Sequence, residues 1–514
     1  MKPLTTSVYT FSDLIAGGYL YVDKTSLIHE LIRGYKGQYF LARPRRFGKS
    51  LLVSTLEVIF QGRRELFEGL AIAKTDYNWK PYPVIHLDMG DRQAGTAAML
   101  ETSLRDGVDE QAHVFKTDLV KGTAAARFRE LVLKLAERDG KVVILVDEYD
   151  KPLLGQLGQP GVRELQSALK AFYGVIKATE AAQRFVLVTG VSKFSKVSIF
   201  SDLNNLTDLT MNRSAATLLG YTQGELEANF PEHIAALAVA LGKSREETLA
   251  ELRDWYNGYR FEETAETVYN PVSVMKCFQE LKFKNYWFET GTPGFLIELL
   301  RRQPLELGNL SAPEAAFSAY DPGDLAALPL LVQTGYLTIK GADELLGTRY
   351  YDLGYPNREI EQSFSYWLAR DLGHVPDGEL GGALRAIHFA LNEGHIGDML
   401  EHLKTFFHGI PNTITLKHEK YYQSLFFAVF KLIGAAIAAE VATSVGRIDA
   451  VVKTKTDIFV FEFKLHGTAE EAMQQIREKQ YAAPYRDDPR KVTLVGAAFD
   501  PAERNLGRWL IEPA

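Results

Sequence analysis

The chain has 514 residues, too many for one compact core, and this length predicts two to four domains. Hydrophobic residues make up 46% and charged residues 24% of the sequence, a composition that excludes disordered and fibrous proteins. With 58 Lys and Arg against 65 Asp and Glu, the formal net charge of −7 excludes a basic field over the whole protein that would attract nucleic acid or membranes. A local basic groove is still compatible with this charge.

A single cysteine, Cys277, excludes a disulfide framework and a cysteine-based zinc site, and we interpret it as a buried thiol. The first residues, MKPLTTSVYTFSDL, lack the basic start and the apolar stretch of a signal peptide. The most apolar segment, Leu425–Ala442, is interrupted by Lys431 and Glu440 and predicts a buried helix rather than a membrane span. We therefore expect a cytoplasmic protein with no membrane partner.

The first 215 residues alternate helical patterns with short apolar runs. The runs are QYFLA (38–42), PVIHLDM (83–89), KVVILVD (141–147) and RFVLVTG (184–190). Continuous apolar runs separated by helices are typical of a parallel sheet that helices cover on both faces. We therefore predict an α/β domain over residues 1–215.

Residues 216–400 predict a helical middle or lid region. Its aromatic-rich stretches are interpreted as packing rather than as ligand sites, and they are WYNGYRF (255–261) and KNYWFETGTPGF (284–295). Residues 401–514 predict a small α/β domain with the order α-β-β-α-β. Its elements are a helix near 419–439, the strands GRIDAVVKT (446–454) and DIFVFEFKL (457–465), a helix near 468–482 and the strand KVTLVGAAF (491–499).

A basic loop, RPRRFGKS (43–50), lies between the strand QYFLA and an apolar helix. Strand, loop, Gly-Lys-Ser and helix is the arrangement that binds nucleotide phosphates, because backbone N–H groups and the helix N-terminus face the anion. Arg43 stands where such a loop usually has its first glycine. The alternative interpretation is a basic surface turn.

The phosphate interpretation assigns a task to each residue of the loop. The backbone of Arg46, Phe47 and Gly48 would surround the phosphates. Lys49 would reach the β- and γ-phosphates, and the Ser50 hydroxyl would hold Mg²⁺. The cofactors expected here are therefore ATP and Mg²⁺.

Two further strand ends carry matching chemistry. The apolar run KVVILVD ends in Asp147 and Glu148, where Asp147 can reach Mg²⁺ and Glu148 can orient the attacking water. The run RFVLVTG ends near Thr189, a polar residue that could sense the γ-phosphate. The alternative is two solvated carboxylates at a strand end. Three strand ends of this kind in one domain favour nucleotide binding.

Several segments closely resemble a bacterial and archaeal family of AAA-like ATPases that carry a PD-(D/E)XK nuclease-like domain at the C-terminus. The segments are YVDKTSLI (21–28), RPRRFGKS (43–50), VDEYDKP (146–152) and TGVSKFSKVSIFSDLNNLTDLT (189–210), and the similarity runs through nearly the whole chain. The family shares the arginine-rich loop.

The resemblance implies Walker A roles for Gly48, Lys49 and Ser50. It also implies Walker B roles for Asp147 and Glu148, and a sensor role for Thr189 or Ser192. Arg213 and Arg260 are candidates for an arginine finger, and neither can be assigned.

A second group of charged residues lies in GRIDAVVKTKTDIFVFEFKL (446–465). Glu462 and Lys464 are two residues apart on a strand, so they project from the same face, and a hairpin turn near 455 brings Asp449 opposite residue 461 or 462. Asp449 and Glu462 can hold Mg²⁺ through oxygen ligands, and Lys464 can stabilise charge on a phosphate or help activate water. The alternative is an ion pair on a half-exposed sheet face.

This group resembles the PD-(D/E)XK nuclease pattern, with Ile448-Asp449 in place of the usual Pro-Asp. By position, the resemblance implies that Glu419 is an additional acid on the preceding helix. It implies that Gln475 is the polar residue on the following helix. The module from 415 to 514 has 14 Lys and Arg against 13 Asp and Glu, so DNA binding would depend on local patches such as Lys417, Lys420, Lys453 and Lys455.

The leading hypothesis is an ATP-binding and ATP-hydrolysing protein with a metal-dependent nuclease domain that acts on nucleic acid, with DNA favoured, and whose ATPase domain gates the nuclease. The alternative is a non-cutting, ATP-driven regulatory switch whose C-terminal domain only binds nucleic acid or a protein partner. A third interpretation is a nucleotide-binding scaffold with structural acids at its C-terminus. A homo-oligomer is expected by analogy only, because ATPase domains of this broad kind often place sites at subunit interfaces.

Overall fold

The structure is a computed structural model that describes residues 1–92, 95–156, 161–193, 205–287, 296, 299–300, 303, 310–317, 326–372, 377–408, 419–434, 436–443, 446–464, 467–500 and 505–514. The chain forms two compact units. The first comprises Met1–Gly291 and Ala312–Glu359, and the second comprises Thr292–Ser311 and Ile360–Ala514. The middle region that the sequence suggested over 216–400 is thus shared between the units.

A five-stranded parallel sheet forms the centre of the first unit, with the strand order β2-β3-β4-β1-β5. Its two middle strands, β3 and β4, are buried along their whole length, as expected for a sheet covered on both faces. The strands are β1 (Gly37–Ala42), β2 (Val84–Asp88), β3 (Val142–Asp147), β4 (Gln183–Gly190) and the short β5 (Thr207–Asp208). The predicted α/β fold of this part of the chain is confirmed.

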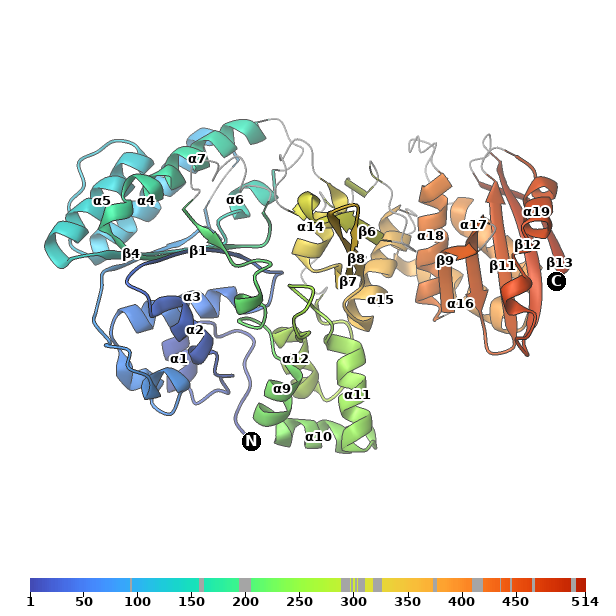
Figure 1. The fold of residues 1–514 in the computed structure, drawn as a ribbon, viewed down its shortest axis with the longest axis horizontal. Coiled ribbons are helices and arrows are strands. Elements are labelled where there is room, and N and C mark those ends of the chain that lie inside the picture. The colour runs from blue at the N-terminus through green and yellow to red at the C-terminus, as the bar shows by residue number, and fades with distance from the viewer. Residues whose placement is uncertain are drawn as a thin grey trace. The chain divides into compact units, whose positions relative to one another are not determined.

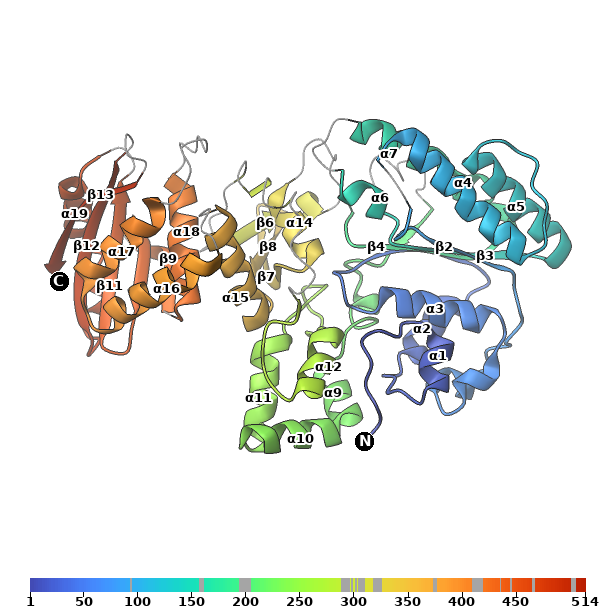
Figure 2. The ribbon, with the colours of Figure 1, turned by 180° about the vertical axis from the view of Figure 1, so that it is seen from behind.

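Helices cover both faces of this sheet (Figures 1 and 2). One layer contains α1 (Phe11–Ala16), α2 (Thr25–Ile32) and α3 (Lys49–Phe60). The other contains α4 (Ala97–Val114), α5 (Ala124–Asp139) and α7 (Val162–Ala178). Because the strands are parallel, the loops after β1, β3 and β4 emerge at the same edge of the sheet, which is where ligands bind in folds of this class.

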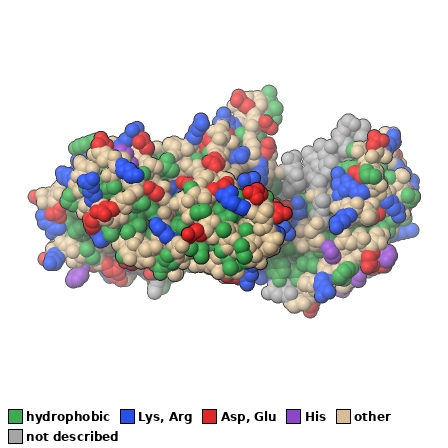
Figure 3. All heavy atoms as spheres, turned by 90° about the horizontal axis from the view of Figure 1, so that it is seen from below, with side chains coloured by type: hydrophobic (Ala, Val, Ile, Leu, Met, Phe, Trp, Pro, Cys, Tyr) green, Lys and Arg blue, Asp and Glu red, His purple; other side chains and the backbone are tan. Residues whose placement is uncertain are grey.

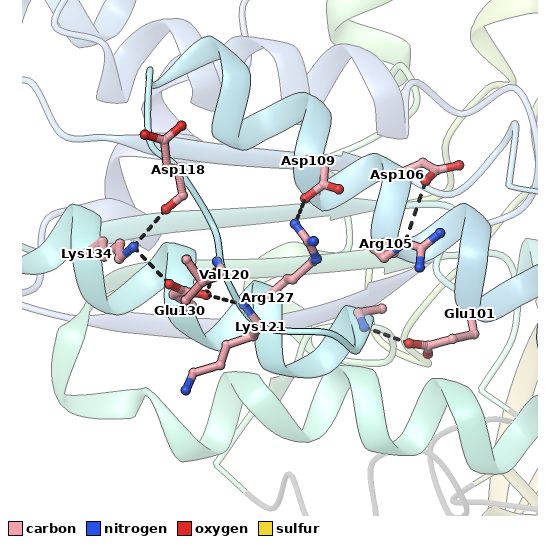
Figure 4. A network of polar contacts seen from close by, with 11 residues as sticks. Glu101, Arg105, Asp106, Asp109, Asp118, Val120, Lys121, Arg127, Glu130 and Lys134 are labelled. Carbon is pink, nitrogen blue, oxygen red and sulfur yellow. Dashed lines mark hydrogen bonds and ion pairs between the residues drawn. The ribbon is translucent and has the colours of Figure 1, made fainter.

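An ion pair joins the outer helices α4 and α5, and a second one lies within α5 (Figure 4). Arg127 on α5 donates to Asp109 on α4 over 2.8 Å. On α5, Glu130 pairs with Lys134 over 2.8 Å and accepts two backbone N–H groups of the preceding loop. The Lys134 ammonium and these N–H groups hold the pKa of Glu130 at about 2. Polar contacts therefore fix this part of the layer.

The rest of the first unit is a helical subdomain and a β-hairpin. The helices enclose an apolar core that contains Leu226, Phe230, Tyr256 and Cys277, so Cys277 is a buried thiol as predicted. The helices are α9 (Gln223–Asn229), α10 (Pro231–Leu241), α11 (Arg245–Tyr256) and α12 (Pro271–Glu280), and a further helix, α14 (Ala327–Thr334), precedes the hairpin. The antiparallel hairpin is formed by β7 (Thr338–Leu345) and β8 (Thr348–Gly354), and β6 (Leu310–Pro313) lies beside β8.

The second unit contains a mixed sheet with the order β13-β12-β11-β10-β9. Only the pair β11–β12 is parallel. The strands are β9 (Ala436–Thr443), β10 (Gly446–Lys453), β11 (Asp457–Lys464), β12 (Lys491–Asp500) and β13 (Asn505–Pro513). The helices are α15 (Arg358–Trp367), which begins at the unit boundary, α16 (Asp377–Asn392), α17 (Ile396–His408), α18 (Glu419–Leu432) and α19 (Ala469–Glu478).

The two faces of β11 pack against different helices. Phe461 and Phe463 contact Phe426 of α18, with ring centroids 5.1 and 4.9 Å apart. Glu462 and Lys464 alternate with these rings and face α19. The predicted projection of Glu462 and Lys464 from one face of a strand is confirmed.

The helix expected near 419–439 is shorter than predicted. α18 ends at Leu432, and Gly434 adopts a positive φ of 75°. The alanine-rich stretch Ala436–Thr443 forms strand β9, which pairs with β10. The helical interpretation of Leu425–Ala442 is therefore wrong beyond residue 432, because strand pairing outweighs the helix propensity of alanine. No helix in the described part of the chain is long and apolar enough to span a bilayer.

A substitution at Gly258 tests how closely the helical subdomain packs against the segment after the hairpin. Its φ is 101°, and an added Cβ would lie 1.9 Å from the carbonyl oxygen of Pro356. We expect Gly258→Ala to lower the free energy of unfolding by about 3 kcal/mol or more, because backbone has to move. Gly242→Ala is the matched control, since Gly242 also has a positive φ of 64° but open space around it.

The control should lose only about 1 kcal/mol, the cost of the left-handed backbone alone. Thermal and urea unfolding of both variants measure the difference. Equal losses in the two variants would contradict the close contact at Gly258.

Candidate nucleotide site and candidate nuclease site

The loop after β1 has the conformation of a phosphate-binding turn. Gly48 caps the N-terminus of α3 with φ 92°, and Arg46 also lies in the left-handed region with φ 67°. An added Cβ at Gly48 would meet nothing within 4 Å, so backbone conformation rather than space calls for glycine here. The twelve-residue helix α3 directs its first N–H groups and the positive end of its dipole toward this loop.

Lys49 lies beneath the loop and is buried. Its ammonium donates to the carbonyl oxygens of Arg43 and Pro44, each over 3.0 Å. Burial lowers the pKa of Lys49, and the nearby carboxylates of Asp147 and Glu148 oppose this shift. A buried cation beside a helix N-terminus is suited to an anionic ligand.

The ends of β3 and β4 meet at Asp147 and Thr189. The Asp147 Oδ1 atom accepts the Thr189 hydroxyl over 2.5 Å and the Glu148 N–H over 3.0 Å. Both side chains are buried. The structure thus brings together the two strand ends that the sequence singled out, and it places the Thr189 hydroxyl on Asp147.

Glu148 follows in a left-handed conformation with φ 51°, which is uncommon for a residue with a side chain. Its carboxylate pairs with Lys151, 3.5 Å away. Residues held in this backbone region often occur at functional sites, where the surrounding structure maintains them. Glu148 is therefore held at the edge of the loop rather than free in solvent.

Ser192 is engaged in a different contact. Its hydroxyl and its backbone N–H both donate to Asp150 Oδ2, over 2.7 and 2.8 Å. Burial raises the pKa of Asp150, although these hydrogen bonds and Lys49 favour the carboxylate. The structure places Ser192 against Asp150, and its sensor role stays a prediction.

A cavity of about 510 Å³ lies over the loop. Its polar wall contains the loop residues Arg45–Ser50 together with Glu148 and Lys151. Its apolar wall comes from the N-terminal segment, from residues 218–221 and from α12, and it includes Val8, Tyr9, Tyr21, Val22, Tyr221 and Met275. One wall that binds anions and one that accepts a flat apolar ring are the two requirements of a nucleotide.

Arg43 is the residue that sequence reasoning left without a role. Its guanidinium is 1% exposed and donates to the carbonyl oxygens of Thr210 and Ala215, over 2.7 and 2.9 Å. It also stacks on the ring of Phe261, 4.0 Å from the centroid. Burial lowers the pKa of Arg43 to about 9. Arg43 therefore attaches the start of the loop to the segment after β5.

The two aromatic stretches, which the sequence suggested serve for packing, make direct contacts with the phosphate loop. Phe47 packs edge-on against Tyr259 and Phe261, with centroids 4.8 and 5.4 Å apart. Arg46 donates to the carbonyl oxygen of Tyr286 over 2.6 Å. The candidate arginine finger Arg260 instead donates to the Lys340 carbonyl over 3.0 Å. The clustering of WYNGYRF and KNYWF was the only indication in the sequence that these contacts exist.

The candidate nuclease residues converge on one face of the second unit's sheet. Ala450 pairs with Phe461, so Asp449 falls opposite Glu462 as predicted, and Asp449 accepts the N–H of Phe463 over 2.8 Å. Lys464 donates to Glu462 over 3.0 Å. Glu462 is 2% exposed, so this is a nearly buried carboxylate.

Gln475 of α19 completes this cluster. Its side-chain oxygen accepts Lys464 over 2.6 Å, and its NH₂ group donates to Glu462. Gln475 also donates to Tyr481, 3.3 Å away. The structure therefore brings together Asp449, Glu462, Lys464 and Gln475, the set that the sequence pattern selected.

The donor set fits a hard divalent cation in kind, since carboxylate oxygens are the ligands that Mg²⁺ prefers. Asp449 and Glu462 would hold the ion. Glu419 is the first residue of α18, and its side chain lies outside what the structure describes. Among the described residues no group of three His, Cys, Asp or Glu side chains forms a metal site.

The surface shows mixed charge. In Figure 3, acidic and basic side chains are interspersed over the face drawn. Lys453 lies over the ring of Tyr485 at 4.9 Å, and Lys455 is exposed in the turn before β11. Lys417 lies outside the described residues, as does the side chain of Lys420.

The fold and the loop define a P-loop ATPase domain joined to a nuclease-like domain, and comparison with known proteins agrees. A family described as predicted AAA-ATPase matches residues 5–200, and the PD-(D/E)XK nuclease superfamily matches residues 417–509. A protein of Azotobacter chroococcum mcd 1, described as an uncharacterized protein in the vnfD 5' region, is 36% identical over 534 residues, which cover 99% of both chains. The chain belongs to this family of AAA-ATPase-like proteins with a C-terminal PD-(D/E)XK domain, as the sequence motifs indicated.

Two solved structures overlap with the chain at low similarity. The Aeropyrum pernix ORC1 protein in complex with DNA is 13% identical, with a TM-score of 0.23 over 71% of this chain and 94% of that chain. The Aeropyrum pernix ORC2 protein, in ADPNP and ADP complexes, is 11% identical, with a TM-score of 0.26 over 70% of this chain and 92% of that chain. Likeness at this level carries no conclusion about function.

The structural role assigned to Arg43 is testable by substitution. We expect Arg43→Met to lower the free energy of unfolding by about 2–4 kcal/mol, because the buried carbonyls of Thr210 and Ala215 lose their donor. Arg63→Met, at a half-exposed arginine on the same unit, should change it by less than about 0.5 kcal/mol. Urea unfolding followed by tryptophan fluorescence measures both, and a neutral Arg43→Met would contradict the assigned role.

Proposed function

We propose that this protein binds and hydrolyses ATP with Mg²⁺ at the loop 43–50, and that its second unit is a Mg²⁺-dependent nuclease gated by the ATPase. The observation that carries the first half is the buried cluster of Lys49, Asp147 and Thr189 beside a cavity with one cationic and one apolar wall. In this proposal the substrate is nucleic acid, with DNA favoured. The protein acts in the cytoplasm, and a homo-oligomer is proposed by analogy with other ATPase domains.

The loop residues divide the work of ATP hydrolysis. The N–H groups of Arg46, Phe47 and Gly48 bind phosphate oxygens, and Lys49 moves from the loop carbonyls to the β- and γ-phosphates. Ser50 and Asp147 would hold Mg²⁺, which supplies neutralising charge for the transferred phosphoryl group.

The strand ends complete the proposed reaction. Glu148 orients the attacking water, and its left-handed backbone keeps it at the loop. Thr189, bonded to Asp147, fixes the carboxylate that would face the ion. Ser192 contributes through Asp150 in this proposal, because its hydroxyl is bonded there.

In the second unit, Asp449 and Glu462 would hold Mg²⁺, which supplies Lewis-acid and water-activating chemistry for phosphodiester hydrolysis. Lys464 contacts the phosphate or the water, and Gln475 keeps Lys464 and Glu462 in place. Glu419 is proposed as the additional acid on α18.

A non-cutting ATP-driven switch is the second candidate. One observation favours it: the buried Glu462 carboxylate accepts hydrogen bonds from Lys464 and from the Gln475 side chain. A buried ion pair of this kind can be purely structural. The two candidates differ in whether the parent protein cleaves nucleic acid at Asp449 and Glu462.

The nucleotide half is tested by two substitutions. Lys49→Ala removes the cation that would contact the phosphates, so ATP affinity should fall by about 10²-fold in calorimetry. Glu148→Gln keeps the shape of the side chain and should retain ATP affinity while hydrolysis slows by about 10²–10⁴-fold. Unchanged ATP binding by Lys49→Ala would remove the nucleotide from this loop, and parental hydrolysis by Glu148→Gln would remove Glu148 from its role.

The nuclease half is tested by Asp449→Asn and Lys464→Met, assayed for cleavage of single- and double-stranded DNA and RNA with Mg²⁺ or Mn²⁺. Each should lower the rate by about 10²-fold or more, since each removes charge that faces the reacting phosphate. Matched controls are Glu478→Gln on the exposed side of α19 and Lys455→Met in the turn. If the parent cuts none of these substrates, the non-cutting switch is favoured, and if both site variants cut like the controls, the cleavage does not come from this site.

A further inference from the structure

One residue of the phosphate loop reaches outside the nucleotide cavity. Arg46 lines the cavity two residues before Gly48, and its guanidinium donates to the carbonyl oxygen of Tyr286 over 2.6 Å. Its left-handed backbone, with φ 67°, ties the direction of the side chain to the conformation of the loop. A change of the loop on binding an anion therefore acts directly on the Tyr286 peptide.

The same short segment is held from its other side by a buried carboxyl. Glu359 is fully buried, and its Oε1 atom accepts the N–H of Tyr286 over 2.6 Å and the N–H of Trp287 over 2.8 Å. Glu359 belongs to the first turn of α15. The contacts thus form a continuous series from the loop through the Tyr286–Trp287 segment to the start of a helix.

The Tyr286–Trp287 segment and Glu359 both lie close in sequence to places where the polypeptide leaves the first unit. The first unit is left after Gly291, four residues beyond Trp287, and again after Glu359 itself. Hydrogen bonds therefore link Tyr286 and Glu359 to the phosphate loop, and these residues lie close in sequence to two of the three crossings between the units.

We propose that the contacts Arg46–Tyr286–Glu359 couple nucleotide binding at the phosphate loop to the two segments that lead into the second unit. In this series of contacts Glu359 is a positioning residue, because it fixes the Tyr286–Trp287 peptide that Arg46 holds. The proposal rests on the proposed nucleotide function and adds to it the route by which the second unit senses the nucleotide.

The physical argument is one of differential contact. A ligand shifts a conformational equilibrium only if some group interacts differently with it in the two states. Arg46 is such a group, because a triphosphate in the cavity would attract its guanidinium while the Tyr286 carbonyl holds it. Coupling between two sites typically changes a binding equilibrium by about 5–150-fold.

The charge on Glu359 makes these contacts depend on pH, which packing alone would not do. Burial raises the pKa of Glu359 to about 7, opposed by the N–H groups of Trp287 and Tyr286, by Ser273 and by Arg46. The other titratable groups facing it are Tyr256 of α11, Tyr259 after that helix and Cys277 of α12, all with pKa values raised mainly by burial. The carboxyl therefore changes charge near neutral pH, whereas these two tyrosines and the cysteine stay neutral.

The sign of the effect follows from this raised pKa. Since the ionised form is disfavoured in the folded state, this group contributes a stability that falls as the pH rises from about 4.5, the ordinary value, to about 7. The ionised carboxylate is the stronger acceptor for the two N–H groups. Coupling should therefore be stronger at pH 8 than at pH 6.

Hydrogen exchange of the full chain, with and without ATPγS and Mg²⁺, tests the proposal. In the parent, the exchange rates of the Tyr286 and Trp287 amides, corrected for intrinsic exchange, should change by about 5-fold or more on adding nucleotide. The change should be larger at pH 8 than at pH 6. Arg46→Met should abolish the response, and Glu359→Gln should weaken it and remove its pH dependence.

Glu361→Gln is the matched control, since Glu361 lies two residues further along α15 and pairs with Lys431 instead. It should keep the parental response. If Glu359→Gln does not fold, Arg46→Met tests the same series of contacts from the phosphate loop. Calorimetry on the same samples separates the two levels of the proposal: nucleotide bound with unchanged exchange at 286–287 overturns the coupling alone, and no nucleotide bound by the parent overturns both.

Discussion

The buried guanidinium of Arg43 is the constraint on which the architecture of the first unit depends. A cation with 1% exposure is costly unless hydrogen bonds compensate for its lost hydration, and here the carbonyls of Thr210 and Ala215 and the face of Phe261 do so. These partners come from the segment after β5 and from the helical subdomain. The loop therefore has its shape only when those parts of the chain are in place.

This constraint explains why the loop is rich in arginine. A phosphate loop made mainly of glycine holds its shape through its own backbone, whereas this loop is anchored by side chains that contact other parts of the first unit. Arg43, Arg46 and Phe47 each contact the helical subdomain or the segment that follows it. Gly48, with φ 92°, is the one position of the turn where glycine is retained for its backbone conformation. The nucleotide site and the middle of the chain are thus parts of one packed structure.

The sequence identified what depends on local pattern. Apolar runs predicted four strands of the parallel sheet, and period-two alternation placed Glu462 and Lys464 on one face opposite Asp449. Prediction from the sequence failed where strand pairing or contacts between distant residues determine the structure. The alanine-rich stretch of β9 has helical propensity and is a strand only because β10 lies beside it, and Glu359 is 313 residues from Arg46 in the chain, so no spacing rule links them.

A crystal structure of the full chain with ATPγS and Mg²⁺ is the most direct test of the central claim, which is that the arginine-rich loop is a nucleotide site anchored from outside. The account predicts phosphates on the N–H groups of residues 46–50 and a Lys49 ammonium that has left the carbonyls of Arg43 and Pro44. It also predicts that Arg43 keeps its contacts with Thr210 and Ala215. A nucleotide bound elsewhere, or Lys49 still bonded to the loop carbonyls beside bound phosphate, would contradict it.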